Sequence, residues 1–249
     1  MFATGNHLIL YVAVGAYVVA LALYYIRIRE SALAFLLFGV IFHILYLVGR
    51  GWLGGTFVAN PMFEGPYILP CAIATITLFS ALLDHDRDWG PLLLPVLLAS
   101  AFALAYPRGM IPPTPKKVTF LANIFFFTEV TAHALFYSGA LLAFKSLLVR
   151  KDTSSYHGYL VWGFVVFSIA QVSGALWCYL GWGNTFRWSS RHMMSAAIWL
   201  YYAAYLHLRF LSEWDAKKKA VFAAVGAAVV FVGSFLSNLH EMHFPRVGG

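Results

Sequence analysis

The chain has 249 residues, of which 61% are apolar and only 11% are charged, and its formal net charge is +7. Soluble domains carry about 25% charged residues, so this composition excludes a soluble globular protein and predicts an integral membrane protein. We expect the positive charge to set the orientation in the membrane and to attract anionic lipid, and it gives no reason to expect nucleic-acid binding.

Apolar runs of about 20 residues, the length with which an α-helix crosses a bilayer, recur along the chain. They predict eight membrane-spanning helices, at 7–27, 31–50, 66–84, 90–106, 119–147, 157–182, 192–212 and 218–238. The first run follows MFATGN, which has no basic residue and no cleavage site, and is predicted to be a retained helix rather than a signal peptide. We therefore expect an all-α integral membrane protein that forms one polytopic membrane domain over residues 1–249.

The basic residues predict how these helices are oriented. The connections after the first, third, fifth and seventh predicted helices hold ten of the 17 Lys and Arg residues. Because cytoplasmic loops carry the excess of positive charge, these connections are predicted to be cytoplasmic. Both termini, and the connection between the sixth and seventh helices, are then predicted to lie on the outer, periplasmic side of the cell's inner (cytoplasmic) membrane.

The connection between the sixth and seventh helices is rich in aromatic residues and reads GALWCYLGWGNTFRWSSRHMM from Gly174 to Met194. Its rings belong to Trp177, Trp182, Phe186 and Trp188. An aromatic belt at the lipid headgroups is one interpretation. The other is a ligand platform, because Arg187, Arg191 and His192 place cationic groups and an imidazole beside flat apolar rings. Such a surface suits haem, which is flat, apolar and doubly carboxylated.

Three of the nine histidines, His43, His133 and His207, are predicted to lie within the membrane. A polar residue at that depth indicates function, and a hydrogen bond between helices is the structural alternative. Neutral imidazole is a usual axial ligand of haem iron. The three histidines are therefore candidate ligands for one or two haem b groups.

Two further groups of polar residues are candidates for the same chemistry. Glu129 lies one turn before His133, so their side chains are expected to meet. We expect Glu129 to orient His133 as a hydrogen-bond acceptor, to take a proton from a quinol, or to bond another helix. Near the C-terminus, His240 and His243 are three residues apart, and either is a candidate iron ligand opposite His192. The two cysteines form no C-x-x-C pair and predict no disulfide framework.

Several motifs resemble the CcsA/ResC/CcmC/CcmF family, the haem-handling membrane proteins of cytochrome c assembly. Trp177, Trp182, Gly183 and Trp188 fit the tryptophan-rich (WWD) pattern W-x4-W-G-x4-W of that family. Leu200 to Arg209 resembles the helix that carries its intramembrane histidine, here His207. The segment SNLH, which ends at His240, resembles its outer-side histidine.

A fourth stretch, HILYLVGRGWLGGTFVANPMFEG from His43 to Gly65, also resembles the family. There a histidine and an arginine precede an Asn-x-x-aromatic-Glu element, here Asn60, Phe63 and Glu64, and we expect Asn60 and Glu64 to order that loop. The resemblance implies that the protein holds haem b at the outer face for attachment to an apocytochrome c. It also implies other membrane subunits and a c-type cytochrome as partners, with a separate or fused subunit supplying the ligand opposite His207. Within this chain, His43 is the candidate for that ligand.

Two departures from the family pattern leave a second function open. Where the family loop continues Trp-Asp-Pro-Lys-Glu, this chain has Trp188-Ser189-Ser190-Arg191-His192. An outer histidine expected near the start of the fifth helix falls at Phe125, and His133 lies two turns deeper. The alternative is a membrane cytochrome b subunit that passes electrons from quinol to an outer multihaem cytochrome c, with a bound quinone. A structural membrane anchor is the third interpretation.

Overall fold

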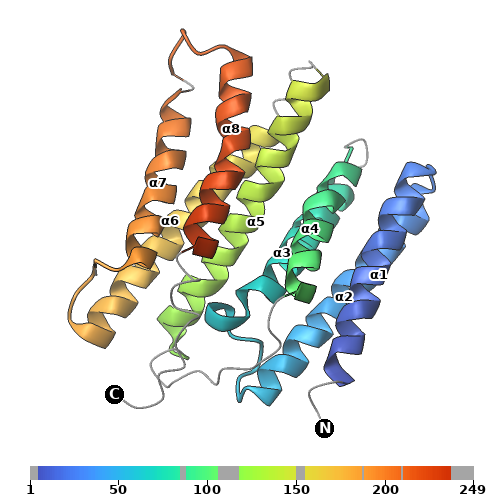
Figure 1. Ribbon diagram of the computed structural model, residues 1–249, viewed down its shortest axis with the longest axis horizontal. Helices are drawn as coiled ribbons and strands as arrows, with labels where there is room; N and C mark the ends of the chain where they lie inside the picture. The colour runs from blue at the N-terminus through green and yellow to red at the C-terminus, as the bar shows by residue number, and fades with distance from the viewer. Residues whose placement is uncertain are drawn as a thin grey trace. The chain divides into compact units, whose positions relative to one another are not determined.

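The structure is a computed structural model that describes residues 5–84, 88–105, 118–149, 155–186, 188–208 and 210–236. All regular secondary structure in these ranges is helical, which confirms the predicted all-α class (Figure 1). The elements are α1 (Gly5–Tyr25), α2 (Arg29–Leu53), α3 (Pro61–Leu83), the 3-10 turn η1 (Gly90–Leu92), α4 (Leu93–Ala105), α5 (Phe120–Val149), α6 (Ser155–Trp182), α7 (Ser190–Leu208), α8 (Ala216–Phe231) and the π-helical turn η3 (Val232–Leu236).

Five of these helices, α1, α2, α3, α5 and α6, are long and apolar enough to cross a membrane, as a multi-pass membrane protein requires. The other three predicted spans fall on helices that are shorter or more polar. The apolar helix at Gly90–Ala105 is below the usual spanning length, α7 begins with Ser-Arg-His, and α8 has only 16 residues and begins with Ala-Lys-Lys-Lys. The total of eight spans stays a prediction.

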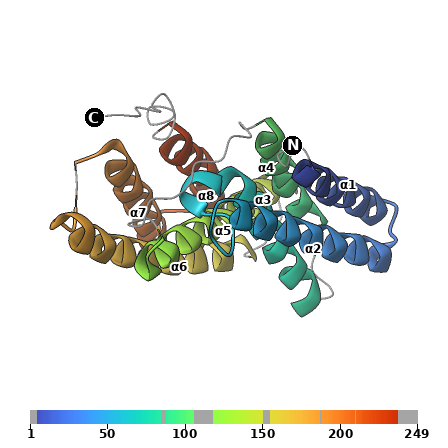
Figure 2. The same cartoon turned by 90° about the horizontal axis from the view of Figure 1, so that it is seen from below.

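The chain divides into two compact units, residues up to Ala134 and residues from Leu135 onward, so the boundary lies within α5. The single domain over 1–249 stays a prediction. In the first unit, α1 and α2 lie side by side (Figures 1 and 2). Gly39 allows this approach, because a Cβ atom there would come within 2.6 Å of the Tyr17 ring.

The buried core of the first unit lies where α1, α2, α3 and α4 meet. It is formed by Leu10, Tyr46, Leu47, Ala59, Tyr67, Ile68, Cys71 and Ala103. Helix α3 begins at Pro61, and the side chain of Asn60 caps it by accepting a hydrogen bond from the Met62 N–H at 3.0 Å. This cap fixes the direction in which the chain enters α3, next to the loop from α2.

In the second unit, α7 packs between α6 and α8 through aromatic side chains (Figure 2). The Trp199 indole of α7 donates to the Ser168 hydroxyl of α6 at 3.0 Å. On the side of α8, the Tyr201 hydroxyl donates to the Phe222 carbonyl at 2.5 Å. The Tyr202 ring stacks on the Phe136 ring of α5, with the two ring centroids 3.6 Å apart. These bonds hold α7, and with it His192 and His207, in a fixed rotation about its axis.

Candidate functional site

The tryptophan-rich connection joins the end of α6 to the start of α7. Helix α6 stops at Gly183, whose φ of +76° is the left-handed conformation that glycine adopts most readily. Its N–H donates to the Tyr179 carbonyl at 2.8 Å and so closes the last turn. The sharp stop turns the chain away from α6 and toward α7.

The four rings of the predicted platform form two pairs, and the two rings of each pair are nearly perpendicular to each other. Trp177 and Trp182 have centroids 5.1 Å apart at an angle of 89°, and Phe186 and Trp188 have centroids 5.4 Å apart at 86°. Trp177 is buried, whereas Trp188 is 86% exposed. The connection therefore offers an exposed aromatic surface anchored by a buried tryptophan.

His192 lies next to this surface, at the start of α7. Its ring centroid is 5.6 Å from that of Phe186. Its Nδ1 atom is 2.8 Å from the Ser189 hydroxyl oxygen, and its Nε2 atom is 3.3 Å from the Cys178 sulfur. The structure thus brings the predicted His192 together with a cysteine that the sequence analysis left without a role.

Some of the predicted outer residues lie outside the described residues, namely Arg187, His240 and His243. Arg191 is described and half-buried, and it follows Ser190 at the start of α7. The part of the site that the structure describes is therefore the two ring pairs, Arg191 and His192.

His207 lies in the last turn of α7 with its side chain exposed. Its Nδ1 atom is 2.7 Å from the Ala203 carbonyl oxygen one turn earlier. A carbonyl can only accept, so Nδ1 carries the proton and donates, and Nε2 keeps its lone pair. That lone pair is the one that binds a metal when the other ring nitrogen is held in this way. The donor chemistry of His207 therefore fits an axial ligand of haem iron.

His43 is fully buried and bonded at both ring nitrogens. Its Nε2–H donates to the Tyr67 carbonyl of α3 at 2.9 Å, and its Nδ1 lies 3.2 Å from the Tyr17 hydroxyl of α1, which donates to it. Pro66 and Pro70 lie in α3 on either side of Tyr67 and lack the N–H groups that would bond the carbonyls of Met62 and Pro66. His43 therefore ties three helices together, and it would have to give up one of these bonds to bind iron.

Arg50 and Glu64 form a buried ion pair that the sequence analysis did not identify. Arg50 Nε is 2.6 Å from Glu64 Oε2 and Nη2 is 2.8 Å from Oε1, with the two side chains 4% and 9% exposed. The Arg50 guanidinium also lies 4.7 Å from the centre of the Tyr67 ring. The available signal was an arginine at the end of one apolar run with a glutamate at the start of the next.

Glu129 and His133 lie one turn apart on α5 and are only 8% and 9% exposed. Both side chains are therefore buried, as their spacing predicts for two residues on one side of a helix. Tyr46, Tyr67 and the neighbouring residue Val130 of α5 belong to the same packed region. This buried pair is separate in sequence from the connection between α6 and α7.

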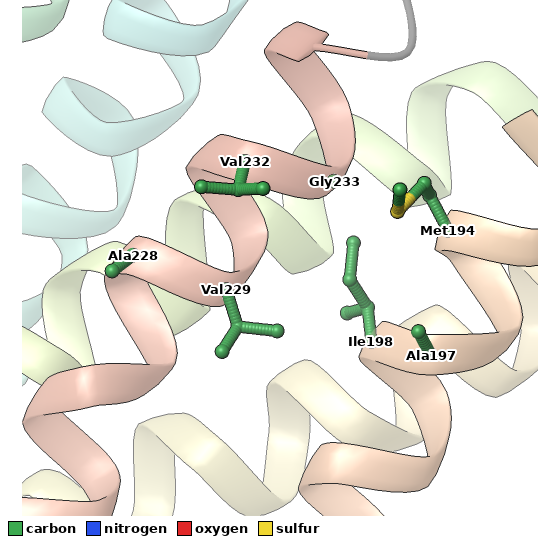
Figure 3. Close-up of a pocket in the computed structure, with 7 residues that line it drawn as sticks. All are labelled: Met194, Ala197, Ile198, Ala228, Val229, Val232 and Gly233. Carbon is green, nitrogen blue, oxygen red and sulfur yellow. The ribbon is translucent and has the colours of Figure 1, made fainter. Parts of the chain in front are cut away.

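An apolar cavity of about 290 Å³ lies between α7 and the end of α8 (Figure 3). Its walls are formed by Met194, Ala197, Ile198, Ala228, Val229, Val232 and Gly233. Figure 3 shows the Ile198 and Val229 side chains reaching into the space between the helices. The lining can hold an apolar group and presents no polar side chain to orient one.

Comparisons with known proteins place the chain in a family. The cytochrome c biogenesis protein CcsA of Prochlorococcus marinus (strain AS9601) is 41% identical over 81 residues, which cover 32% of this chain and 26% of that protein. The same-named protein of Thermosynechococcus vestitus is 40% identical over 70 residues, 28% of this chain and 22% of its own length. That of Guillardia theta is 24% identical over 216 residues, 81% of this chain and 69% of that protein.

The matched segments thus span about a quarter of the cyanobacterial relatives. A much longer match comes from a family model described as "Cytochrome C assembly protein", which matches residues 7–243 and so includes every described helix except the first residues of α1. The chain belongs to the family of cytochrome c assembly proteins.

Proposed function

We propose that this protein holds haem b in the inner membrane and presents it at the outer face for attachment to an apocytochrome c. Membership in the cytochrome c assembly family supports this proposal, as do the relatives whose name is cytochrome c biogenesis protein CcsA. When bound, haem supplies the group that a c-type cytochrome carries covalently.

The geometry of His207 carries the haem-binding part of the proposal. Its Nδ1–H is held by the Ala203 carbonyl, and its Nε2 lone pair projects from an exposed part of α7. An exposed imidazole at a predicted membrane depth is costly unless it meets a partner. In this proposal, haem bound beside this face together with a second membrane subunit provides that partner.

We propose that the aromatic side chains of the connection between α6 and α7 form the haem platform, at the predicted outer end of α7. The exposed Trp182, Phe186 and Trp188 rings would cover the flat face of haem, and Arg187 and Arg191 would pair with its carboxylates. His240, His192 and His243 are the proposed sources of an outer axial ligand. Of these, the described His192 must first release the Cys178 thiol from its Nε2 atom.

The remaining polar residues take supporting roles in this proposal. Asn60 and Glu64 order the connection from α2 to α3 through the helix cap and the Arg50 pair. On α5, His133 remains a candidate haem ligand and Glu129 a candidate acceptor for its hydrogen bond. We do not propose the cytochrome b alternative or a quinone site, because the relatives carry names of biogenesis proteins and nothing in the described residues favours electron transfer from quinol.

The first test is the haem content of the purified protein, measured by the pyridine haemochrome and the reduced-minus-oxidised spectrum. We expect His207→Gly to lose most of the bound haem and to recover it when imidazole is added, because free imidazole replaces the missing ligand. His157→Gly is the matched control, since His157 has no proposed role in binding iron; its Nδ1 atom lies 3.1 Å from the Tyr205 hydroxyl. Wild-type haem content in His207→Gly would contradict the assignment.

A further inference from the structure

The first turn of α8 carries three consecutive lysines, Lys217, Lys218 and Lys219. None of them forms an ion pair with a described residue, and the Lys218 ammonium donates to the backbone carbonyl of Glu213 at 3.4 Å. The start of a helix is the positive end of its dipole, so cations are disfavoured there. The Asp215 carboxylate is used by the helix cap, where it accepts a hydrogen bond from the Lys218 N–H at 2.7 Å. This turn therefore holds an excess of positive charge that an anion from outside the chain would offset.

A line of exposed apolar side chains runs along α8 from these lysines. Val221 and Val225 are 45% and 50% exposed, and Ala228 is exposed as well. They follow the exposed Lys217 and Lys218 at intervals of three or four residues, so all of them share one side of the helix. The opposite side of α8 is buried through Ala220, Ala223, Gly226 and Val230. One surface of α8 thus combines a cationic end with an apolar side.

The apolar side of α8 leads to the cavity of about 290 Å³ between α7 and the end of α8. Ala228 belongs to both, and Val232, one turn further along, also lines the cavity (Figure 3). Ala228 lies ten residues after Lys218, which is about 15 Å along a helix. That is half of the roughly 30 Å thickness of the hydrocarbon core, and so the depth of one lipid leaflet. An acyl chain whose headgroup lies at the lysines would therefore end in this cavity.

We propose that α8 binds one anionic phospholipid, with the headgroup phosphate at Lys217 and Lys218 and an acyl chain along Val221 and Val225 into the cavity. A phospholipid is the fitting occupant because it carries a phosphate and an apolar chain of this length in one molecule. The unpaired lysines favour a headgroup with net negative charge over a zwitterionic one. Orientation in the membrane needs positive charge somewhere in the connection, but it does not explain why the lysines stand in a helical turn at the end of an apolar surface.

Native mass spectrometry of the delipidated full chain in detergent tests the headgroup part of the site. The protein is titrated with palmitoyl-oleoyl phosphatidylglycerol, which is anionic, or with phosphatidylcholine that has the same chains. A basic residue near the membrane surface strengthens anionic lipid binding about fivefold, so wild type should prefer phosphatidylglycerol by about tenfold or more. We expect Lys217→Gln with Lys218→Gln to lose this preference. The matched control, Arg27→Gln with Arg29→Gln, also removes two exposed charges and should keep it.

A second variant tests the acyl chain. Ala228→Trp fills the cavity, so it should weaken the binding of both lipids by a similar factor and leave the preference for phosphatidylglycerol unchanged. Ala34→Trp, at an exposed alanine of α2, is its control and should bind as wild type does. Glycerol phosphate, which has a phosphate and no chain, should fail to displace the bound lipid.

Three results would overturn the proposal. They are wild-type affinities for the two lipids that agree within twofold, an unchanged preference in the double lysine variant, and full displacement of the lipid by glycerol phosphate. Unchanged lipid binding in Ala228→Trp would remove the acyl chain from the cavity and overturn that part. Thermal unfolding of each variant shows that a loss of binding is not a loss of folding. None of the substituted residues is assigned to the haem site, so the result does not depend on the proposed haem function.

Discussion

The buried Arg50–Glu64 pair joins the last turn of α2 to the first turn of α3. Both hydrogen bonds of the fork are made, at 2.6 and 2.8 Å, which is the geometry that best offsets the loss of hydration. Arg50 also lies near the faces of Tyr46 and Tyr67. One ion pair therefore links α2 to α3 beside the Asn-x-x-aromatic-Glu element.

Removing one partner of this pair should be costly, whereas removing both should cost much less. We expect Arg50→Met to destabilise the protein by about 3–5 kcal/mol, because Glu64 would stay buried without its partner. The double variant Arg50→Met with Glu64→Leu should recover much of that loss. Thermal unfolding in detergent measures the order of stability of these variants. The control is Arg29→Met, because Arg29 is an exposed arginine on the same helix, and we expect it to change stability by less than about 0.5 kcal/mol. A double variant less stable than the single one would contradict this account.

At the level of single residues, the sequence indicated candidate side chains but not the groups that they contact. The depth of His43 and His207 in apolar runs marked both as candidate ligands. Only the structure distinguishes them, since His43 is bonded at both nitrogens while His207 is held at one. A pairing of this kind depends on which helix packs opposite, and hydropathy along one chain contains no information on that neighbour. The Cys178–His192 contact escaped prediction for the same reason.

At the level of elements, the turn after α2 requires a glycine at position 51, because the backbone of the connection packs directly against it. The Ala59 N–H donates to the Leu47 carbonyl at 3.0 Å and the Thr56 N–H to the Gly51 carbonyl at 2.8 Å, so the connection folds back along the end of α2. A Cβ atom on Gly51 would lie 2.3 Å from the carbonyl carbon of Val58. A backbone atom cannot move aside as the end of a side chain can.

Gly51→Ala should therefore displace this connection and weaken the Arg50–Glu64 pair beside it. We expect a clear fall in the thermal unfolding midpoint and faster proteolysis between α2 and α3. Gly15→Ala is the matched control, because Gly15 is also helical but has no atom within 4 Å of the added methyl group. Alanine favours a helix over glycine by up to about 1 kcal/mol, so that variant should be as stable as wild type or more so. Equal stability of the two variants would show that the Gly51 contact is unimportant.

Apolar length predicted where each helix lies, and local composition explains most differences at the ends. The span expected at 90–106 begins as a 3-10 turn, Gly90–Leu92, which contains Pro91, and Gly90 packs so closely on Tyr24 that an added Cβ atom would collide with its ring. The span expected at 31–50 continues to Leu53. The π-helical turn after α8 was not predicted from the sequence, and within it a Cβ atom added to Gly233 would lie 2.9 Å from the Ile198 side chain.

At the level of the whole molecule, the number of membrane crossings decides whether His192 and His207 lie on different sides. Helix α7 has 19 residues, which at 1.5 Å per residue is about 28 Å, close to the 30 Å of the hydrocarbon core. It begins with Arg191 and His192, and positively charged Lys217 to Lys219 follow its other end at the start of α8. A crossing helix is consistent with these lengths, and the excess of positive charge in the α7–α8 connection predicts that this end of α7 is cytoplasmic.

Labelling of single cysteines can test this topology in intact cells. In a variant without Cys71 and Cys178, a cysteine replaces either Asn184, exposed between α6 and α7, or Ser212, exposed between α7 and α8. We expect a membrane-impermeant maleimide to label the cysteine at 184 from outside and the one at 212 only after the cells are opened, because α7 carries the chain across the membrane. Labelling of both from outside would mean that α7 does not cross. The reverse pattern would turn the protein over, which would move the aromatic connection to the cytoplasm and remove it from any c-type cytochrome outside.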